Sequence, residues 1–315
     1  MIWRGLPDLE GTPAPPGRPS GASGSMPGIH QMLIVHTISE VRDQVAVARR
    51  DGKTIGLVPT MGALHEGHLT LVRRARRECG FVCVSIFVNP TQFGPSEDFT
   101  RYPRTLDADS DKCREAGVDL IFAPNAQEMY PEGFDTWVEV GGVTEMLEGK
   151  LRPGHFRGVA TVCLKLFNIF QPRCAYFGQK DYQQLQVVTK MVRDLNLPLE
   201  IVPVEIVRES DGLAMSSRNR YLNPEERQAA LILSKSLAEA KSAFDSGERS
   251  APAIQSLVQA RLDSEPLAKT DYAIIVDAET LLPIDTITRP AVILLAVRIG
   301  PTRLIDNVVL RSQST

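Results

Sequence analysis

This 315-residue sequence lacks long apolar runs and paired cysteine motifs. Its longest purely apolar stretch, residues 291–297, is far shorter than the roughly 20 residues that a membrane-spanning helix needs. The five cysteines form no Cys-x-x-Cys pair, which argues against a structural zinc site, and three of them lie in apolar stretches typical of core residues. We therefore expect no membrane-spanning helix and a reducing, cytoplasmic location.

An excess of positive charge is also missing. The sequence has 35 Lys and Arg against 38 Asp and Glu, for a formal net charge of −3. This balance excludes a generally basic protein that coats nucleic acid, so no nucleic-acid partner is expected. The 43% of hydrophobic residues is enough for one large or two ordinary domains.

The first 30 residues differ in composition from the rest. They contain six Gly and six Pro and have no apolar run, so they lack the hydrophobic segment of a signal peptide. We expect residues 1–30 to form a disordered leader.

From residue 31 onward, short apolar runs alternate with segments of helical periodicity. Strands are expected at residues 55–59, 81–88, 119–123, 174–177 and 199–207. Helices are expected at residues 69–77, 107–116, 157–170 and 182–195. Because the strands are apolar on both faces, the pattern predicts an α/β domain over residues 31–206 with a parallel sheet covered on both sides.

The pattern changes near residue 207. Helices are expected at residues 224–246, with Asn223 as N-cap and Pro224 at the first position, and at residues 251–262. Three strands follow, at residues 272–276, 292–297 and 304–309. We therefore expect a second, smaller α+β domain over residues 207–315.

The most informative segment is PTMGALHEGH, residues 59–68, between an expected strand and an expected helix. Its two glycines allow close approach of backbone to a ligand, and the unpaired N–H groups of a following helix favour phosphate. His65 and His68 supply neutral donors or, when protonated, positive charge. The alternative is a glycine turn with two exposed histidines. The spacing does not match the His-Glu-x-x-His zinc motif, but it resembles the His-x-Gly-His signature of adenylyl-transferring enzymes.

Further polar segments lie at other expected junctions. FGQKDYQQ, residues 177–184, places Lys180 beside a glycine at a strand-to-helix junction, which favours phosphate. In the alternative interpretation Asp181 caps the helix and Lys180 is solvated. MSSRN, residues 215–219, offers Arg218 near the domain boundary but could also be an ordinary linker. FVNPTQF, residues 87–93, places the amides of Asn89 and Gln92 at a strand's carboxyl end, where ligands bind in α/β sheets, or forms a simple polar turn.

These segments, together with YPRT and LRPGHFRGV, resemble the pantoate–β-alanine ligase family, and the resemblance extends over the chain after residue 31. It implies a Rossmann-like ATP domain with a smaller C-terminal lid, and a homodimer. The implied reaction uses ATP to adenylate the carboxylate of (R)-pantoate, releasing pyrophosphate. The amine of β-alanine then displaces AMP and forms pantothenate.

The resemblance also assigns roles to residues. His68, as proton donor, is expected to be catalytic together with His65, Lys180 and Arg218. The residues implied to bind ATP are Met61, Gly62, Ala63, Leu64, His65, Glu66, Gly67, His68, Gly178, Gln179, Lys180, Asp181, Val207, Met215, Ser216, Ser217 and Arg218.

The acid and amine substrates and a metal ion are assigned in the same way. Gln92 and Gln184 are implied to hold pantoate, and Gln92 also to contact β-alanine. Mg²⁺ is expected on the phosphates of ATP, with most of its ligands from ATP and water. Some members of the family have a carboxylate run after Tyr-Pro-Arg-Thr near the metal. Here that run is Asp107-Ala108-Asp109, and Asp109 is the best candidate. Arg152 and His155 fall in a loop expected near the site.

Three other classes of protein compete with this interpretation. A cytidylyltransferase or a phosphopantetheine-type nucleotidyltransferase would share the histidine motif but not NPTQF and QKDYQQ. A non-catalytic nucleotide-binding module would have lost some of the polar groups. A tRNA-charging enzyme would be expected to carry basic appendages, against which the net charge of −3 argues.

Overall fold

The computed structural model describes residues 32–95 and 97–311, so the leader expected at residues 1–30 lies outside the described residues. None of the helices in this part of the chain is long and apolar enough to cross a membrane. The strands of a first sheet are β1 (Leu33–Val35), β2 (Ile55–Thr60), β3 (Phe81–Ile86), β4 (Leu120–Phe122), β5 (Cys174–Gly178) and β6 (Glu200–Val204).

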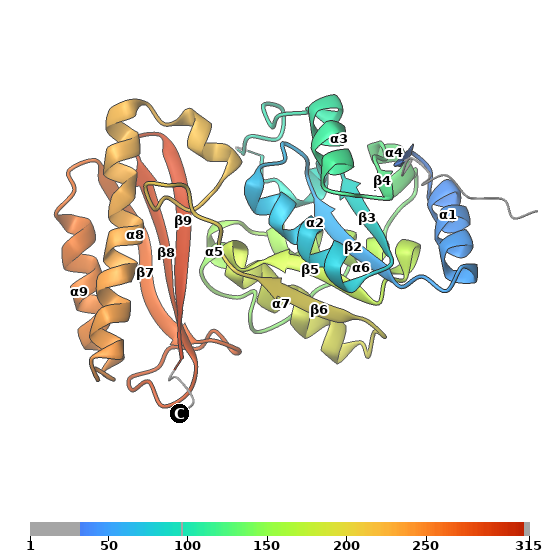
Figure 1. Ribbon diagram of the computed structural model, residues 1–315. Coiled ribbons are helices and arrows are strands. Elements are labelled where there is room, and N and C mark those ends of the chain that lie inside the picture. The colour runs from blue at the N-terminus through green and yellow to red at the C-terminus, as the bar shows by residue number, and fades with distance from the viewer. Residues whose placement is uncertain (1–31, 96, 312–315) are drawn as a thin grey trace, which may run out of the picture. The chain divides into compact units, whose positions relative to one another are not determined.

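The first sheet has six strands in the order β1-β4-β3-β2-β5-β6 (Figure 1). Every adjacent pair is parallel. This confirms the parallel sheet predicted from strands that are apolar on both faces.

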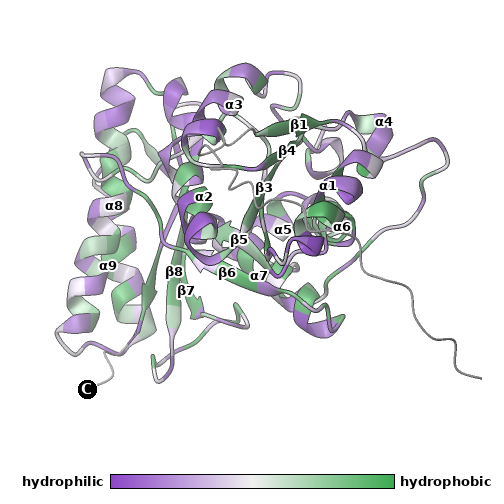
Figure 2. Ribbon diagram, turned by 45° about the vertical axis from the view of Figure 1, so that its right-hand side comes forward, coloured by the Kyte–Doolittle hydropathy of each residue, from purple (hydrophilic) through white to green (hydrophobic). Residues whose placement is uncertain are grey.

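Successive residues of these strands belong to two different hydrophobic cores. Leu57 of β2 packs into one core with helices of one face, whereas the next residue, Val58, packs into the other. Leu120 and Ile121 of β4 divide in the same way. The strands of this sheet are mainly green, that is hydrophobic, in Figure 2, as expected of strands that helices cover on both faces.

The helices around this sheet divide between its two faces. Side chains of α2 and α3 enter one core and those of α1, α6 and α7 the other. The helices up to the second sheet are α1 (Ile38–Arg50), α2 (Glu66–Glu78), α3 (Leu106–Glu115), α4 (Ala126–Met129), α5 (Glu148–Leu151), α6 (His155–Phe170) and α7 (Tyr182–Asp194).

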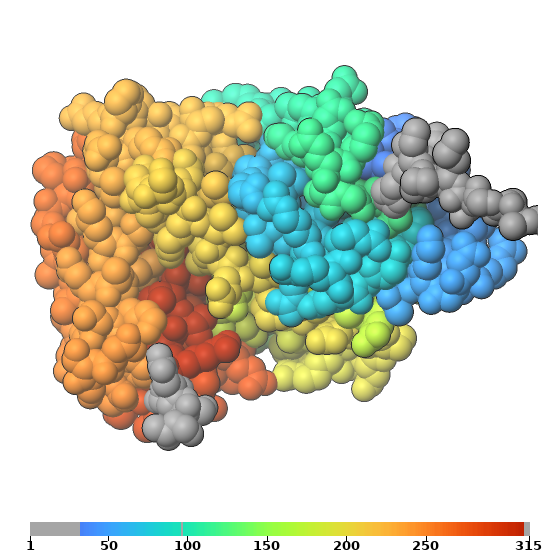
Figure 3. Space-filling view, in the orientation of Figure 1, coloured from blue at the N-terminus to red at the C-terminus, as the bar shows by residue number. Residues whose placement is uncertain are grey.

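A second sheet is antiparallel and has three strands in the order β7-β8-β9. Its elements are α8 (Pro224–Asp245), α9 (Ala251–Asp263), β7 (Ala268–Asp277), β8 (Ala291–Ile299) and β9 (Thr302–Leu310). Ile293 and Leu295 face a core shared with α8 and α9, whereas Val292 and Leu294 join a core of the first sheet. In Figures 1 and 3 this orange-to-red part of the chain lies beside the blue-to-yellow part.

Several local expectations are confirmed and some boundaries move. Asn223 caps α8 by accepting from the N–H of Glu226 at 2.9 Å, and Pro224 is the first helical residue. The structure corrects the start of the helix expected at residue 69: α2 begins at Glu66, so Gly67 and His68 belong to its first turn. The domain division expected at residue 207 stays a prediction.

Candidate functional site

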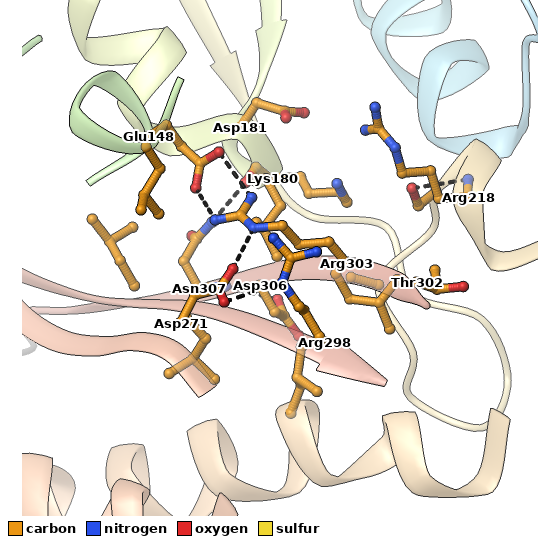
Figure 4. A pocket seen from close by; sticks show the side chains of 18 of the residues that line it. Glu148, Lys180, Asp181, Arg218, Asp271, Arg298, Thr302, Arg303, Asp306 and Asn307 are labelled. Carbon is orange, nitrogen blue, oxygen red and sulfur yellow. Dashed lines mark hydrogen bonds and ion pairs between the residues drawn. The ribbon is translucent and has the colours of Figure 1, made fainter. Parts of the chain in front are cut away.

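A cavity of about 740 Å³ lies between loops at the carboxyl ends of the first sheet and the strands of the second (Figure 4). The loops after β3 and β5 contribute charged side chains, as do the segment after β6 and strands β7, β8 and β9. The charged and amide residues that line it include Glu97, Asp98, Glu148, Arg152, Lys180, Asp181, Gln184, Arg218, Asp271, Arg298, Arg303, Asp306 and Asn307.

The histidine loop joins β2 to α2. His65 is the last residue before the helix, and its carbonyl accepts the N–H of His68 at 2.8 Å. The N–H of His65 in turn donates to Nδ1 of His68 at 3.3 Å. Because Nδ1 accepts this bond, a neutral His68 carries its proton on Nε2.

Both histidines of this loop are neutral at pH 7. Burial, followed by the charge of Lys180, lowers the pKa of His65 to about 4. Burial, followed by His65, lowers the pKa of His68 to about 3. A neutral ring with a proton on Nε2 can donate a hydrogen bond to a phosphate oxygen but brings no positive charge.

Gly67 allows the ring of His65 to lie close to the first turn of α2. A Cβ atom at Gly67 would lie 2.9 Å from Cε1 and 3.0 Å from Nδ1 of His65. Nδ1 of His65 is buried and has no hydrogen-bond partner among the described residues. Beneath the same loop, the fully buried carboxylate of Asp109 accepts the N–H groups of Ala63 and Leu64.

The second predicted segment follows β5 and precedes α7. Lys180 and Asp181 both line the cavity. Asp181 makes no side-chain cap on α7, which contradicts the capping alternative for this residue. Desolvation is the largest single influence and raises the pKa of Asp181, but the neighbouring positive charges, of which Lys180 and Arg218 are the largest, together outweigh it and the net pKa is lowered. Asn307 of β9 donates to the carbonyls of Gln179 and Lys180 at 2.9 and 3.0 Å.

The third segment, around residues 215–219, contacts the loop after β3 at the cavity wall. Oγ of Ser216 accepts the N–H of Arg218 at 3.3 Å. The guanidinium of Arg218 pairs with Asp98 at 3.2 Å (Figure 4 shows Arg218 at the cavity's edge). The carbonyl of Val207 accepts the N–H of Met215 at 2.9 Å, which closes the loop between these two residues just before the segment.

The two predicted glutamines have different surroundings. Gln184, in the first turn of α7, lines the cavity and is only half-buried. Gln92 is buried, accepts from Nδ2 of Asn89 at 3.1 Å, and donates from Nε2 to the sulfur of Met61 at 3.1 Å. Asn89 thus helps to hold Gln92 rather than facing the cavity itself.

His155 links the Gln92 turn to the cavity wall. Its Nδ1 lies 2.8 Å from the carbonyl of Gln92, and its Nε2 lies 3.1 Å from Nη1 of Arg152. Since a carbonyl only accepts and a guanidinium only donates, the proton of His155 is on Nδ1. Burial, then Arg152, lowers the pKa of His155 to about 4, so the ring is neutral. Arg152 also binds both carboxylate oxygens of Glu97, at 2.6 and 2.7 Å.

Sequence patterns missed the charged cluster of the second sheet. Arg303 of β9 donates to both oxygens of Glu148 at 2.7 and 2.9 Å, and the hydroxyl of Tyr272 donates to Glu148 at 2.7 Å (Figure 4). Nε of Arg303 also binds Asp271 at 2.7 Å. Arg303 and Asn307 lie four positions apart and therefore on the same face of β9, so two long polar side chains on one face of a strand are the signal that could have found them.

The structure brings only some of the predicted residues to the cavity wall. Lys180, Asp181, Gln184, Ser216 and Arg218 line it. The predicted residues that do not line it are Met61, Gly62, Ala63, Leu64, His65, Glu66, Gly67, His68, Gln92, Asp109, Gly178, Gln179, Val207, Met215 and Ser217. The histidine loop nevertheless lies close enough to Lys180 and Asp181 for their charges to shift the pKa values of both histidines.

Comparisons with known proteins cover nearly all of the described chain. A family model described as pantoate-beta-alanine ligase matches residues 33–309. A pantothenate synthetase from Heliobacterium modesticaldum is 57% identical over 275 residues, which is 86% of this chain and 98% of that protein. One from Roseiflexus is 57% identical over 281 residues, 89% of this chain and 100% of that protein.

Solved structures agree with the sequence relatives. A crystal structure of pantothenate synthetase from Thermus thermophilus has a TM-score of 0.85 and 50% identity, and the match covers 89% of this chain and all of that chain. A pantoate-beta-alanine ligase from Francisella tularensis, complexed with beta-gamma ATP and beta-alanine, has a TM-score of 0.73 and 33% identity, with 89% and 98% coverage. These matches confirm the expected Rossmann-like domain followed by a smaller C-terminal domain.

Proposed function

The chain belongs to the pantoate–β-alanine ligase family, and from that premise we propose how its residues join (R)-pantoate to β-alanine with ATP. In the first step a carboxylate oxygen of pantoate attacks the α-phosphorus of ATP, and the bond to the pyrophosphate oxygen breaks. In the second step the amine of β-alanine attacks the acyl carbon of the adenylate, and AMP leaves. Neither step needs a nucleophile from the protein.

The observation that carries this proposal is that Lys180 and Arg218 both line the cavity, and that Lys180 lies close enough to the histidine pair to help lower the pKa of both rings. Lys180 and Arg218 supply positive charge for oxygens that become more negative in the first step. His68, neutral and protonated on Nε2, donates a hydrogen bond there and leaves the net charge of the site unchanged. The backbone N–H of His65 donates to Nδ1 of His68 and thereby keeps the proton of that ring on Nε2.

Further ATP contacts follow the resemblance and are part of the proposal. The backbone of residues 61–68 and 178–181 faces the nucleotide, Val207 contacts adenine, and residues 215–218 close on the phosphates. Asn307 supports this arrangement because it binds two carbonyls of the Lys180 segment.

The acid and amine substrates are proposed to bind beside the nucleotide. Gln184 lines the cavity without a hydrogen-bond partner among the described residues, so its amide is free to bind a hydroxyl of pantoate. Gln92 is proposed as the second pantoate ligand and as a contact of β-alanine. Its hydrogen bond to the weak acceptor Met61 is easily exchanged for a substrate oxygen.

Mg²⁺ is proposed to accompany ATP, where it neutralises charge on the phosphate oxygens. Among residues 32–95 and 97–311, no group of three or more His, Cys, Asp or Glu side chains is placed to hold a metal ion. These residues fit an ion held mainly by ATP and water, because Mg²⁺ keeps several waters and needs few protein ligands. We also propose a homodimer, a cytoplasmic location and a domain boundary near residue 207, on the resemblance to the family and the sequence pattern.

The test is incubation with ATP, (R)-pantoate and β-alanine, followed by measurement of AMP, pyrophosphate and pantothenate. Pantoate alone should support exchange of labelled pyrophosphate into ATP, since the adenylate forms before β-alanine reacts. Exchange that requires β-alanine, or formation of ADP, would contradict the two-step reaction. Transfer of an adenylyl group to a product that retains it would indicate a nucleotidyltransferase instead.

A further inference from the structure

Side chains of helix α3 bind the backbone of the histidine loop on both sides of Leu64. Oδ1 of Asp109 accepts the N–H of Leu64 at 2.8 Å, and Oδ2 accepts the N–H of Ala63 at 2.9 Å. The hydroxyl of Thr105 also donates to Oδ2, at 3.0 Å. One turn later, Nζ of Lys112 donates to the carbonyl of Leu64 at 2.6 Å. Both peptide groups that flank Leu64 are therefore bound by α3.

The loop needs this support because its backbone is strained. Ala63 has a φ of +51°, in the left-handed region that residues with a Cβ rarely adopt. Such a conformation costs about 1–3 kcal/mol and persists only where the surroundings enforce it. Gly62, with a φ of +84°, lies so close that a Cβ there would be 3.1 Å from Oδ2 of Asp109. The carboxylate therefore packs directly under the strained turn and binds the N–H groups that the turn leaves unpaired.

The position of residue 64 determines the geometry of the two histidines. The next N–H along the chain, that of His65, donates to the ring of His68. The carbonyl of His65 accepts the N–H groups of His68 and Leu69 at 2.8 and 3.1 Å. A displacement at Leu64 thus moves the start of α2 and the His68 ring together.

We propose that Asp109 is a positioning residue of the histidine loop, with Lys112 as its second anchor, and that it is not a ligand of Mg²⁺. Asp109 is fully buried, and its two oxygens receive three hydrogen bonds from the chain. A magnesium ion would have to displace the N–H groups of Ala63 and Leu64, and it dehydrates reluctantly in buried sites. The inference rests on the proposed function, in that the loop is taken to bind ATP.

The first experiment compares Asp109→Asn with Asp107→Asn, the same chemical change on an exposed carboxylate in the first turn of α3. An asparagine at residue 109 would have an NH₂ group in place of one carboxylate oxygen. This group would face the N–H of Ala63 or Leu64 and could not accept its hydrogen bond. We expect kcat of D109N to fall about 10- to 100-fold, because small displacements of reacting groups have effects of that size. The Mg²⁺ concentration that gives half-maximal rate should stay as in the wild type, and D107N should match the wild type in both measurements.

A second readout needs neither metal nor nucleotide. The amide protons of Ala63 and Leu64, assigned in a ¹⁵N-labelled sample, should exchange faster in D109N than in D107N or the wild type. A several-fold rise in the half-saturating Mg²⁺ concentration, with kcat restored at saturating Mg²⁺, would overturn the proposal in favour of a metal ligand. Unchanged exchange of both amides would overturn it as well.

Lys112→Met keeps the inference testable where D109N fails to fold. It removes the second anchor, keeps most of the aliphatic side chain and leaves the carboxylate in place. We expect lower kcat with an unchanged Mg²⁺ dependence, whereas wild-type kcat would overturn the role of Lys112. If the wild-type protein forms neither AMP nor pantothenate, the proposed function fails by itself, and the amide exchange still decides whether Asp109 holds the loop.

Discussion

Replacing Arg303 by Met should destabilise the protein by removing the closer of the two cations of the buried Glu148 carboxylate and leaving only Arg152, at 4.0 Å. Arg303 makes two hydrogen bonds to Glu148 and one to Asp271. Its side chain is 21% exposed, and that of Glu148 is 10% exposed. The hydroxyl of Tyr272 would be the main remaining donor to Glu148.

The size of the effect follows from this burial. Removing one partner of a buried ion pair typically costs about 3–5 kcal/mol. Because Arg303 is partly exposed, we expect the lower end, about 3 kcal/mol. With an unfolding entropy of about 2.1 cal/mol/K per residue, a chain of this size loses about 1.5 °C in Tm for each kcal/mol, so Tm should fall by roughly 4–5 °C.

The pH dependence gives an independent check. Burial raises the pKa of Glu148, but its hydrogen bonds and ion pair with Arg303 have the larger effect, so the pKa in the folded protein lies below the usual 4.5. A lowered pKa stabilises the fold above the pKa of the unfolded chain, and this contribution is lost as the pH falls through the folded pKa. The difference between wild type and R303M should therefore be larger at pH 7 than at pH 4.

The assay is urea unfolding of the ligand-free protein, followed by circular dichroism at both pH values. Lys241→Met is the control, since it removes an exposed i,i+4 pair with Asp245 on α8 and should cost only about 0.3–0.5 kcal/mol. Adding Glu148→Gln to R303M should recover about 1–2 kcal/mol, because the unpaired charge is removed. A cost for R303M no larger than that of K241M, or one equal at both pH values, would refute the reasoning.

Five further changes test the site. His68→Ala and Lys180→Ala should each lower kcat by about 10²–10³ with unchanged circular dichroism, and near-normal turnover would remove that residue from the mechanism. Gln184→Ala should raise KM for pantoate while calorimetry shows unchanged ATP binding; lower thermal stability with an unchanged preference for pantoate over its deoxy analogue would point to a structural role. Gly178→Ala adds a Cβ with no heavy atom within 4 Å, so Tm should hold while KM for ATP rises; an unchanged KM would show that the nucleotide lies elsewhere. Gly67→Ala should lower the free energy of unfolding by about 1–3 kcal/mol, because its Cβ would lie 2.9 Å from His65, and full stability would contradict that contact.

The local sequence pattern was sufficient to predict the main sheet, one helix cap and the polar segments at the ends of strands. Strands that are apolar on both faces predicted the parallel sheet, because each face of β2 or β4 needs its own cover of helices. The cap at Asn223 depends only on residues within one turn, and it is present as predicted. The glycine-rich and polar segments at strand ends were also identified from sequence, since parallel strands present their carboxyl ends at one edge of the sheet.

The ends of elements were less well predicted than their existence. The helix expected from residue 69 begins at Glu66 because Gly67 and His68 continue the first turn, although glycine disfavours helix. Apolar periodicity carries no signal there, since Glu66, Gly67 and His68 have no apolar side chains to bury.

By itself, then, the sequence determined the parallel sheet, the cap of α8, the family and the motifs that can meet a nucleotide. Only the tertiary structure decided which charges meet: Arg218 pairs with a residue 120 positions away, and Arg303 pairs with Glu148 across 155 positions. It also decided that Asp109 faces the backbone of the histidine loop, 45 and 46 positions earlier in the chain. The physical reason is that periodicity and capping act over one or two turns, whereas these contacts depend on how the two sheets and α3 pack against one another.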